Sequence, residues 1–110
     1  MESFSFTTPA KKSVAKRAHI GVVGSGDLEI LLEPGTSGTT IFNVRTASEG
    51  FKETWRAVFK RFTVHHDIDA IITINDFGAT PGVVSLRLAQ AVEISNQTKN
   101  GPPRDILQQK

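Results

Sequence analysis

The chemical group that stands out in the sequence is a serine hydroxyl between two glycines, in the stretch Gly24-Ser25-Gly26-Asp27. Glycine has no side chain and loses more backbone entropy on folding than other residues, so a glycine on each side of Ser25 indicates that something approaches the hydroxyl closely. A serine nucleophile would need a histidine base, an orienting carboxylate and a Gly-x-Ser-x-Gly elbow, and Val23 stands where that elbow needs its first glycine. Two interpretations stay open: ordinary turn residues, or a serine that receives a group from another enzyme.

Three other motifs fail on their spacing or their context. The dinucleotide-binding pattern Gly-x-Gly-x-x-Gly would begin at Gly24 and needs a glycine where the chain has Glu29. The tripeptide Asp76-Phe77-Gly78 also occurs in protein kinases, which need a lysine strand, a catalytic loop and a far longer chain. His65 and His66 are adjacent, so they cannot form the i, i+4 pair of a helical metal site. The sequence therefore predicts no catalytic residue and no metal site.

The composition limits the classes of protein to consider. A chain of 110 residues is expected to form one domain, and the absence of cysteine excludes a disulfide framework and a thiolate site. No apolar stretch approaches the ~20 residues of a membrane span, and the order of a signal peptide is missing, so we expect a cytoplasmic protein without a membrane partner. Part of the net charge of +2 comes from Lys11, Lys12, Lys16 and Arg17. We interpret this cluster as solvated, not as a nucleic-acid site, because tyrosine for base stacking is absent.

Alternating hydrophobic residues predict the strands that position Ser25. The expected strands cover residues 18–23, 28–33, 39–46 and 69–74. Only Gly24 to Asp27 separate the first two, which predicts a tight hairpin in which Gly26 takes a positive φ. Ser25 would then lie at an exposed tip.

Helical periodicity replaces the alternation after residue 48. A first amphipathic helix is predicted by an apolar face that consists of Phe51, Trp55, Val58, Phe59 and Phe62. We assign this aromatic face to the core and not to a cofactor, because large aromatic side chains dominate core burial. A second helix is predicted to begin with Thr80 as its N-cap and Pro81 in its first turn, and to bury Val84, Leu88, Ala91 and Val92.

Together these elements predict an α+β fold in the order β-β-β-α-β-α, in which one mainly antiparallel sheet packs under two helices. The first three strands are expected to form a meander. Residues 1–17 are expected to be a basic N-terminal arm, flexible or paired as a short edge strand through Phe4 and Phe6 before Pro9. The domain itself would span residues 18–95, and the polar segment 96–110 would be a mobile tail.

Three segments of the sequence resemble a known family: GVVGSGDLEILLEP, FKETWRAVFKRF and NDFGATPGVVSLRLAQA. They are similar to the acyl carrier (delta) subunits of bacterial malonate decarboxylases over roughly residues 18–93. A weaker similarity, around the Ser-Gly-Asp step, extends to the carrier (gamma) subunit of citrate lyase. Asn75 departs from the family pattern, in which a histidine precedes the aspartate.

The resemblance implies a role for each residue of the serine stretch. Ser25 would carry a phosphoribosyl-dephospho-CoA arm through a phosphodiester, and Gly24 and Gly26 would clear space for the transferase that attaches it. Asp27 would position a magnesium ion or accept a hydrogen bond during that transfer.

The resemblance also implies the partners and the work of the chain. The partners would be the acyl transferase and decarboxylase subunits of malonate decarboxylase and the prosthetic-group transferase. Malonyl would be loaded on the arm in exchange for acetyl and then decarboxylated by a partner, so the chain itself would be a non-catalytic carrier. The common fatty-acid and polyketide carriers are acidic four-helix bundles, whereas a β-rich fold is expected here. The alternative is a small nucleotide- or RNA-binding α+β domain without covalent modification.

Overall fold

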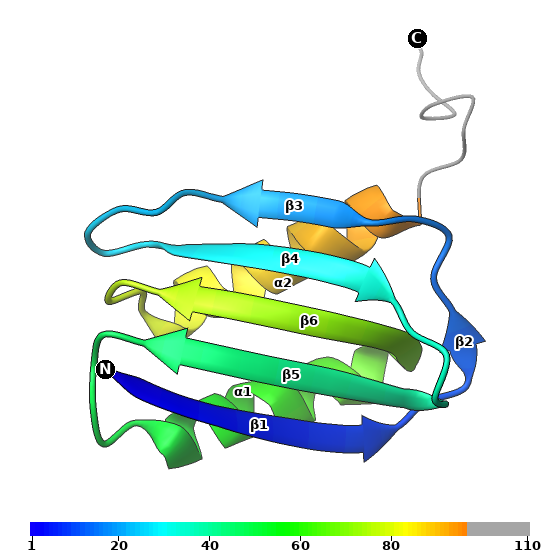
Figure 1. Ribbon diagram of the computed structural model, residues 1–110, viewed down its shortest axis with the longest axis horizontal. Helices are drawn as coiled ribbons and strands as arrows, with labels where there is room; N and C mark the ends of the chain where they lie inside the picture. The colour runs from blue at the N-terminus through cyan, green and yellow to red at the C-terminus, as the bar shows by residue number, and fades with distance from the viewer. Residues whose placement is uncertain (97–110) are drawn as a thin grey trace, which may run out of the picture.

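The computed structural model describes residues 1–96 (Figure 1). In chain order the elements are β1 (Glu2–Pro9), β2 (Lys12–Ser13), β3 (Ala18–Gly21), β4 (Leu28–Pro34), β5 (Thr39–Thr46), α1 (Lys52–His65), β6 (Ile68–Asp76) and α2 (Pro81–Ser95). Both helices lie behind the sheet in the view of Figure 1, α1 behind the β1 and β5 side and α2 behind the β3 and β4 side. The predicted α+β class is confirmed, with β1 and β2 added ahead of the predicted order, and the fold is not a helical bundle.

The strand order of the sheet is β1-β5-β6-β4-β3, and the two-residue strand β2 pairs with the start of β6. Three strand pairs are antiparallel, namely β1 with β5, β3 with β4, and β4 with β6. The pairs β5–β6 and β2–β6 are parallel, and α1 forms the connection from β5 to β6.

The expected meander is therefore wrong, because β6 lies between β4 and β5. The physical reason lies in the sequence of β6. This strand buries Ile72 and Ile74 completely on the helix side and also carries Ile71 on the other side. So apolar a strand gains most from a central position, where it has a neighbour on both edges.

The structure differs from the prediction at the end of one strand and at the start of one helix. The strand expected over residues 18–23 ends at Gly21, whose φ is +88° and where an added Cβ would clash with the Leu28 carbonyl. Val22 and Val23 therefore leave the ladder and are 59% and 64% exposed. Phe51, expected in the core, lies just before α1 and is 52% exposed.

The N-terminal segment contributes an edge strand. Phe4 and Phe6 lie in β1 opposite Val44 and Phe42 of β5, and they pack against the core with their side chains half-buried. The strand runs on to Pro9, so it is longer than the short strand expected there. Apart from Asn96, the tail expected over residues 96–110 lies outside the described residues.

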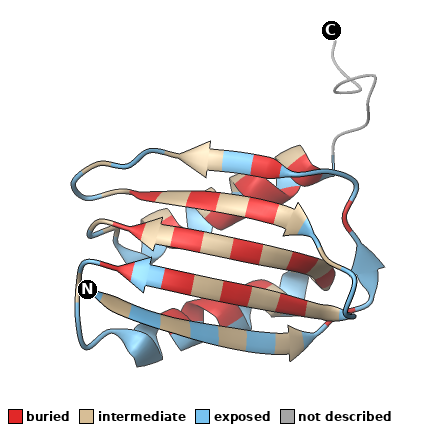
Figure 2. Ribbon diagram, viewed as in Figure 1, coloured by how far each residue is buried: buried red, intermediate tan, exposed pale blue. Residues whose placement is uncertain are grey.

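The core lies between the sheet and the helices. Figure 2 shows buried residues alternating with less buried ones along the central strands, as expected for a sheet covered on one face. Phe42 of β5 and Phe59 of α1 are fully buried, and their rings stack with centroids 4.0 Å apart. Leu28, Ile30 and Leu32 of β4 are fully buried as well. This core fixes β4, and with it the C-terminal end of the serine loop.

Candidate functional site

Ser25 lies in the loop that joins β3 to β4, at the end of the sheet where the β5–α1 and β6–α2 loops also lie (Figure 1). The Asp27 amide donates to the Gly24 carbonyl at 3.1 Å, which closes a four-residue turn with Ser25 and Gly26 at its centre. Gly26 has a φ of +78°, a conformation that favours glycine. The Ser25 side chain is exposed and forms no hydrogen bond with any residue of the described part of the chain.

Two backbone hydrogen bonds hold this turn against the loop that follows β6. The Gly26 amide donates to the Phe77 carbonyl at 2.8 Å, and the Phe77 amide donates to the Asp27 carbonyl at 2.9 Å. Gly78 lies beside the turn, because a Cβ added to it would be in ordinary van der Waals contact with the Gly26 Cα, at 3.8 Å. The serine is therefore displayed at a fixed position.

The Asp27 carboxylate provides a third anchor. It accepts hydrogen bonds from Arg87 Nη2 at 2.8 Å, from Arg87 Nε at 3.3 Å and from the Leu28 amide at 2.7 Å. The hydrogen bonds from Arg87, followed by that from the Leu28 amide, hold the pKa of Asp27 below its usual range. Arg87 lies on α2, so this ion pair ties the serine loop to the helix layer.

The role of Arg87 was not predicted from the sequence. The available signal was its position three residues after the buried Val84 on α2, which places an arginine beside the face that packs on the sheet. Its partner is 60 residues away in sequence. The role expected for Asp27, in magnesium positioning or in accepting a hydrogen bond during transfer, stays a prediction.

The Asp76-Phe77-Gly78 tripeptide shapes the neighbouring loop. The Asp76 side chain is 3% exposed, accepts a hydrogen bond from the Thr46 hydroxyl at 2.8 Å and another from the Ala79 amide at 2.9 Å. Thr80 then caps α2, because its hydroxyl accepts from the Val83 amide at 3.2 Å. Asp76 therefore fixes the loop in which the Phe77 backbone is hydrogen-bonded to the serine turn.

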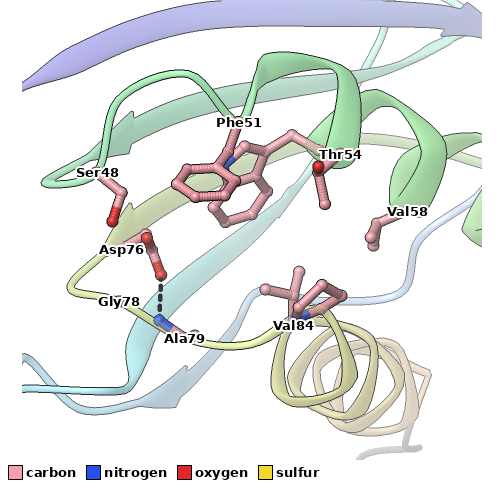
Figure 3. A pocket seen from close by; sticks show the side chains of 10 residues that line it. Ser48, Phe51, Thr54, Val58, Asp76, Gly78, Ala79 and Val84 are labelled. Atoms are coloured by element: carbon pink, nitrogen blue, oxygen red, sulfur yellow. Dashed lines mark hydrogen bonds between the residues drawn. The ribbon is translucent and has the colours of Figure 1, made fainter.

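A cavity of about 390 Å³ lies between the first turns of α1 and α2 (Figure 3). Gly78 lines this cavity and directly follows Phe77, whose backbone is hydrogen-bonded to the serine turn. The cavity and the serine turn are therefore adjacent.

The histidines lie apart from this site. On the sheet face opposite the helices, His19 Nε2 lies 2.8 Å from Glu29 Oε2, and Asn75 donates to Glu29 Oε1 at 3.1 Å. These two hydrogen bonds, the larger effect coming from His19, hold the pKa of Glu29 below its usual range. His66 packs on the Phe62 ring, and burial, together with the charge of His65, lowers its pKa.

Within residues 1–96 no group of three His, Cys, Asp or Glu side chains is placed to hold a metal ion. Over the same range no helix is both long and apolar enough to cross a membrane.

The fold and the site define a small α+β domain that presents an exposed serine on a turn held by backbone hydrogen bonds. Comparison with known proteins makes this assignment specific. The family model of the malonate decarboxylase delta subunit (MdcD) matches residues 15–95. The chain therefore belongs to the malonate decarboxylase delta-subunit family.

Individual relatives agree with the family model. The chain is 50% identical to the malonate decarboxylase acyl carrier protein of Azotobacter vinelandii over 98 residues, 87% of this chain and 99% of that protein. It is also 50% identical to the protein of the same name from Pseudomonas fluorescens SBW25 over 94 residues, 84% of this chain and 95% of that protein.

A solved structure is similar as well. It is a chain of a Pseudomonas malonate decarboxylase hetero-tetramer in complex with malonate, with a TM-score of 0.81 and 46% identity. The match covers 86% of this chain and 98% of that one.

Proposed function

We propose that this chain is the acyl carrier subunit of malonate decarboxylase and that the Ser25 hydroxyl carries a covalent phosphoribosyl-dephospho-CoA group. The observation that carries the proposal is an exposed hydroxyl on a turn held by two backbone hydrogen bonds and by the Asp27–Arg87 ion pair. The acyl carrier names of its relatives support the same function.

The surroundings of Ser25 fit the attachment of so large a group. An added Cβ at Gly24 would meet only a Val22 methyl, at 3.9 Å, and at Gly26 it would meet nothing within 4 Å. The flanks of the hydroxyl are therefore open to a transferase that brings an activated nucleotide donor. In that step the Ser25 Oγ–P bond forms, the P–O bond to a diphosphate leaving group breaks, and the hydroxyl proton passes to the transferase. The attached group supplies a thiol, which a cysteine-free chain lacks.

In this proposal the chain transports the acyl group and leaves the chemistry to its partners, the acyl transferase and decarboxylase subunits. Loss of carbon dioxide from a malonyl thioester develops enolate charge, which fixed hydrogen-bond donors must stabilise. Tethering makes each encounter intramolecular, with effective concentrations of about the mM range for short flexible links. The similar chain in a hetero-tetramer supports the assignment to a multi-subunit assembly. A cytoplasmic location stays a prediction.

The intact mass of the protein from its native host tests the proposal. We expect a mass increase equal to one phosphoribosyl-dephospho-CoA group, and we expect Ser25→Ala to abolish both this increase and the malonate decarboxylase activity of the assembled complex. Ser37→Ala is the matched control, because Ser37 is also exposed and also precedes a glycine of positive φ, Gly38, but it lies in the β4–β5 loop at the other end of the sheet. An active complex whose carrier has an unmodified mass would overturn the proposal, and reversible nucleotide or RNA binding by such a carrier would favour the alternative function.

A further inference from the structure

The cavity between the first turns of α1 and α2 has an apolar interior and a polar edge (Figure 3). Trp55, Val58 and Val84 form buried parts of its wall, and Phe51 lies half-exposed over it. Figure 3 shows the ring of Phe51 at the cavity, which Trp55 also lines. Phe51 exposes apolar surface to water beside the cavity, and a ligand that covered this surface would gain binding free energy from its burial.

The polar edge of the cavity contains hydroxyl and carboxylate groups that could form further hydrogen bonds beyond those in the described part of the chain. The hydroxyls of Ser48 and Thr54 form no hydrogen bond within residues 1–96 and line the cavity. The Asp76 carboxylate uses one acceptor site of each oxygen, for Thr46 and for Ala79, whereas each carboxylate oxygen has two such sites. A ligand with amide N–H donors therefore finds acceptors here.

The charge of the wall restricts the ligand further. Asp76 is the acidic residue in the wall, and no lysine, arginine or histidine is among the described residues that line the cavity. A second carboxylate brought beside a buried one is strongly disfavoured, because like charges repel and neither is fully hydrated. The cavity therefore suits a neutral ligand and rejects an anionic one.

The position of the cavity connects it to Ser25. Gly78 lines the cavity and directly follows Phe77, whose backbone is hydrogen-bonded to Gly26 and Asp27, so a long flexible group attached at Ser25 can fold over this wall. We propose that the cavity receives the end of the arm on Ser25, as the pantetheine amides with a thiol or an acetyl thioester, and that it excludes the malonyl thioester. This inference rests on the proposed function. The cavity would then distinguish between the two acyl groups on the arm. The acetyl thioester would bind in the cavity, whereas the malonyl thioester would stay in solvent, accessible to a partner subunit.

The cavity contains its own reporter, because Trp55 is the one tryptophan of the chain. The full chain, produced in a host that does not attach the arm, is titrated with pantetheine, S-acetylpantetheine and S-malonylpantetheine while Trp55 emission is followed. We expect a saturable change with the first two probes and at least about ten-fold weaker binding of the third. Unchanged emission with all three probes, or equal affinity for the acetyl and malonyl probes, would overturn the inference.

Two substitutions of the exposed Thr54, with a control substitution at Thr63, test whether the probes bind in this cavity. Thr54→Phe fills the mouth of the cavity and should weaken the acetyl probe about ten-fold or more, whereas Thr63→Phe, on the same helix but away from the cavity, should leave its affinity unchanged. Thr54→Lys adds a cation at the edge and should narrow the difference between the acetyl and malonyl probes. If Thr63→Phe weakened binding as much as Thr54→Phe, the probes would bind elsewhere and the inference would fail.

These titrations use no attached arm, so their outcome is separate from the mass measurement on Ser25. A modified Ser25 with a cavity that binds no probe rejects this inference and leaves the proposed function intact. An active complex with an unmodified serine rejects the proposed function, and with it the selectivity that we infer.

Discussion

Gly24 and Gly26 flank the same hydroxyl for different physical reasons. Gly26 has a φ of +78°, where an L side chain is strained, so the turn itself needs this glycine. Gly24 has no such φ and no close neighbour that would exclude a Cβ. The sequence predicted the positive φ of Gly26 from the expected turn, and the structure confirms it. It did not predict that only one of the two glycines is required by the backbone conformation of the turn.

The two glycines therefore predict a contrast between two alanine variants. Gly26→Ala should lower the free energy of unfolding by about 1–2 kcal/mol, the cost of a left-handed conformation for an L residue. Gly24→Ala should leave the free energy of unfolding unchanged or slightly raised, but it should slow attachment of the arm to Ser25, because the new methyl lies beside the hydroxyl. Urea unfolding and the time course of the intact mass measure the two effects. Attachment at the wild-type rate in Gly24→Ala would show that this glycine is not needed for access.

Between elements, the contact that matters most for the site is the ion pair of Asp27 in the serine loop with Arg87 in α2. Local rules did predict where α2 begins, because an N-cap threonine followed by proline acts within a few residues. No local rule pairs two residues that lie 60 positions apart. The ion pair therefore could not be predicted from the sequence, although both of its elements could.

Arg87→Met keeps most of the side-chain length of Arg87 and removes its charge, so it should lower the melting temperature near neutral pH. The pKa of Asp27 is lowered in the folded state, so the pair contributes fully above the unfolded-state value of about 3.9. Its contribution is lost as the pH falls through the lower folded-state pKa. The difference in melting temperature between wild type and variant should therefore persist down to about pH 5 and shrink below about pH 4.

Arg17→Met is the control for this pH series, since the Arg17 side chain is exposed and lies 3.7 Å from the Glu33 carboxylate. Its melting temperature should stay close to that of the wild type throughout. A difference between wild type and Arg87→Met that does not change with pH would mean that Arg87 acts by packing alone.

At the scale of the whole molecule, the sequence predicted the layers but not the order of the strands. The spacing of hydrophobic residues distinguishes strands from helices. Because each predicted strand and helix has one apolar face, the sequence predicts a sheet covered by helices. The order of strands depends on contacts between distant segments, such as Ile72 of β6 with Leu32 of β4 on one side and Phe42 of β5 on the other. The apolar run of β6 was the signal that could have placed it at the centre.

Phe59 joins the layers, because its ring stacks on Phe42 of the sheet and also contacts Phe6 and Trp55. Phe59→Ala should lower the free energy of unfolding by about 3–5 kcal/mol through lost burial and a cavity. Phe51→Ala makes the same change at a half-exposed position just before α1 and should cost much less. Urea unfolding of both variants measures the contrast, and similar losses would contradict the placement of the core.

The central place of β6 also bears on how the chain acquires its structure during synthesis. Because β6 is the last strand of the described residues to leave the ribosome, the earlier strands of this sheet can form only the separate pairs β1–β5 and β3–β4 until it emerges. Its pairing with both β4 and β5 then joins the two halves, and only then can the Phe77 backbone hold the turn that carries Ser25. A nascent chain therefore cannot offer its serine in the final geometry to a modifying enzyme before about seven-tenths of the 110 residues have been added.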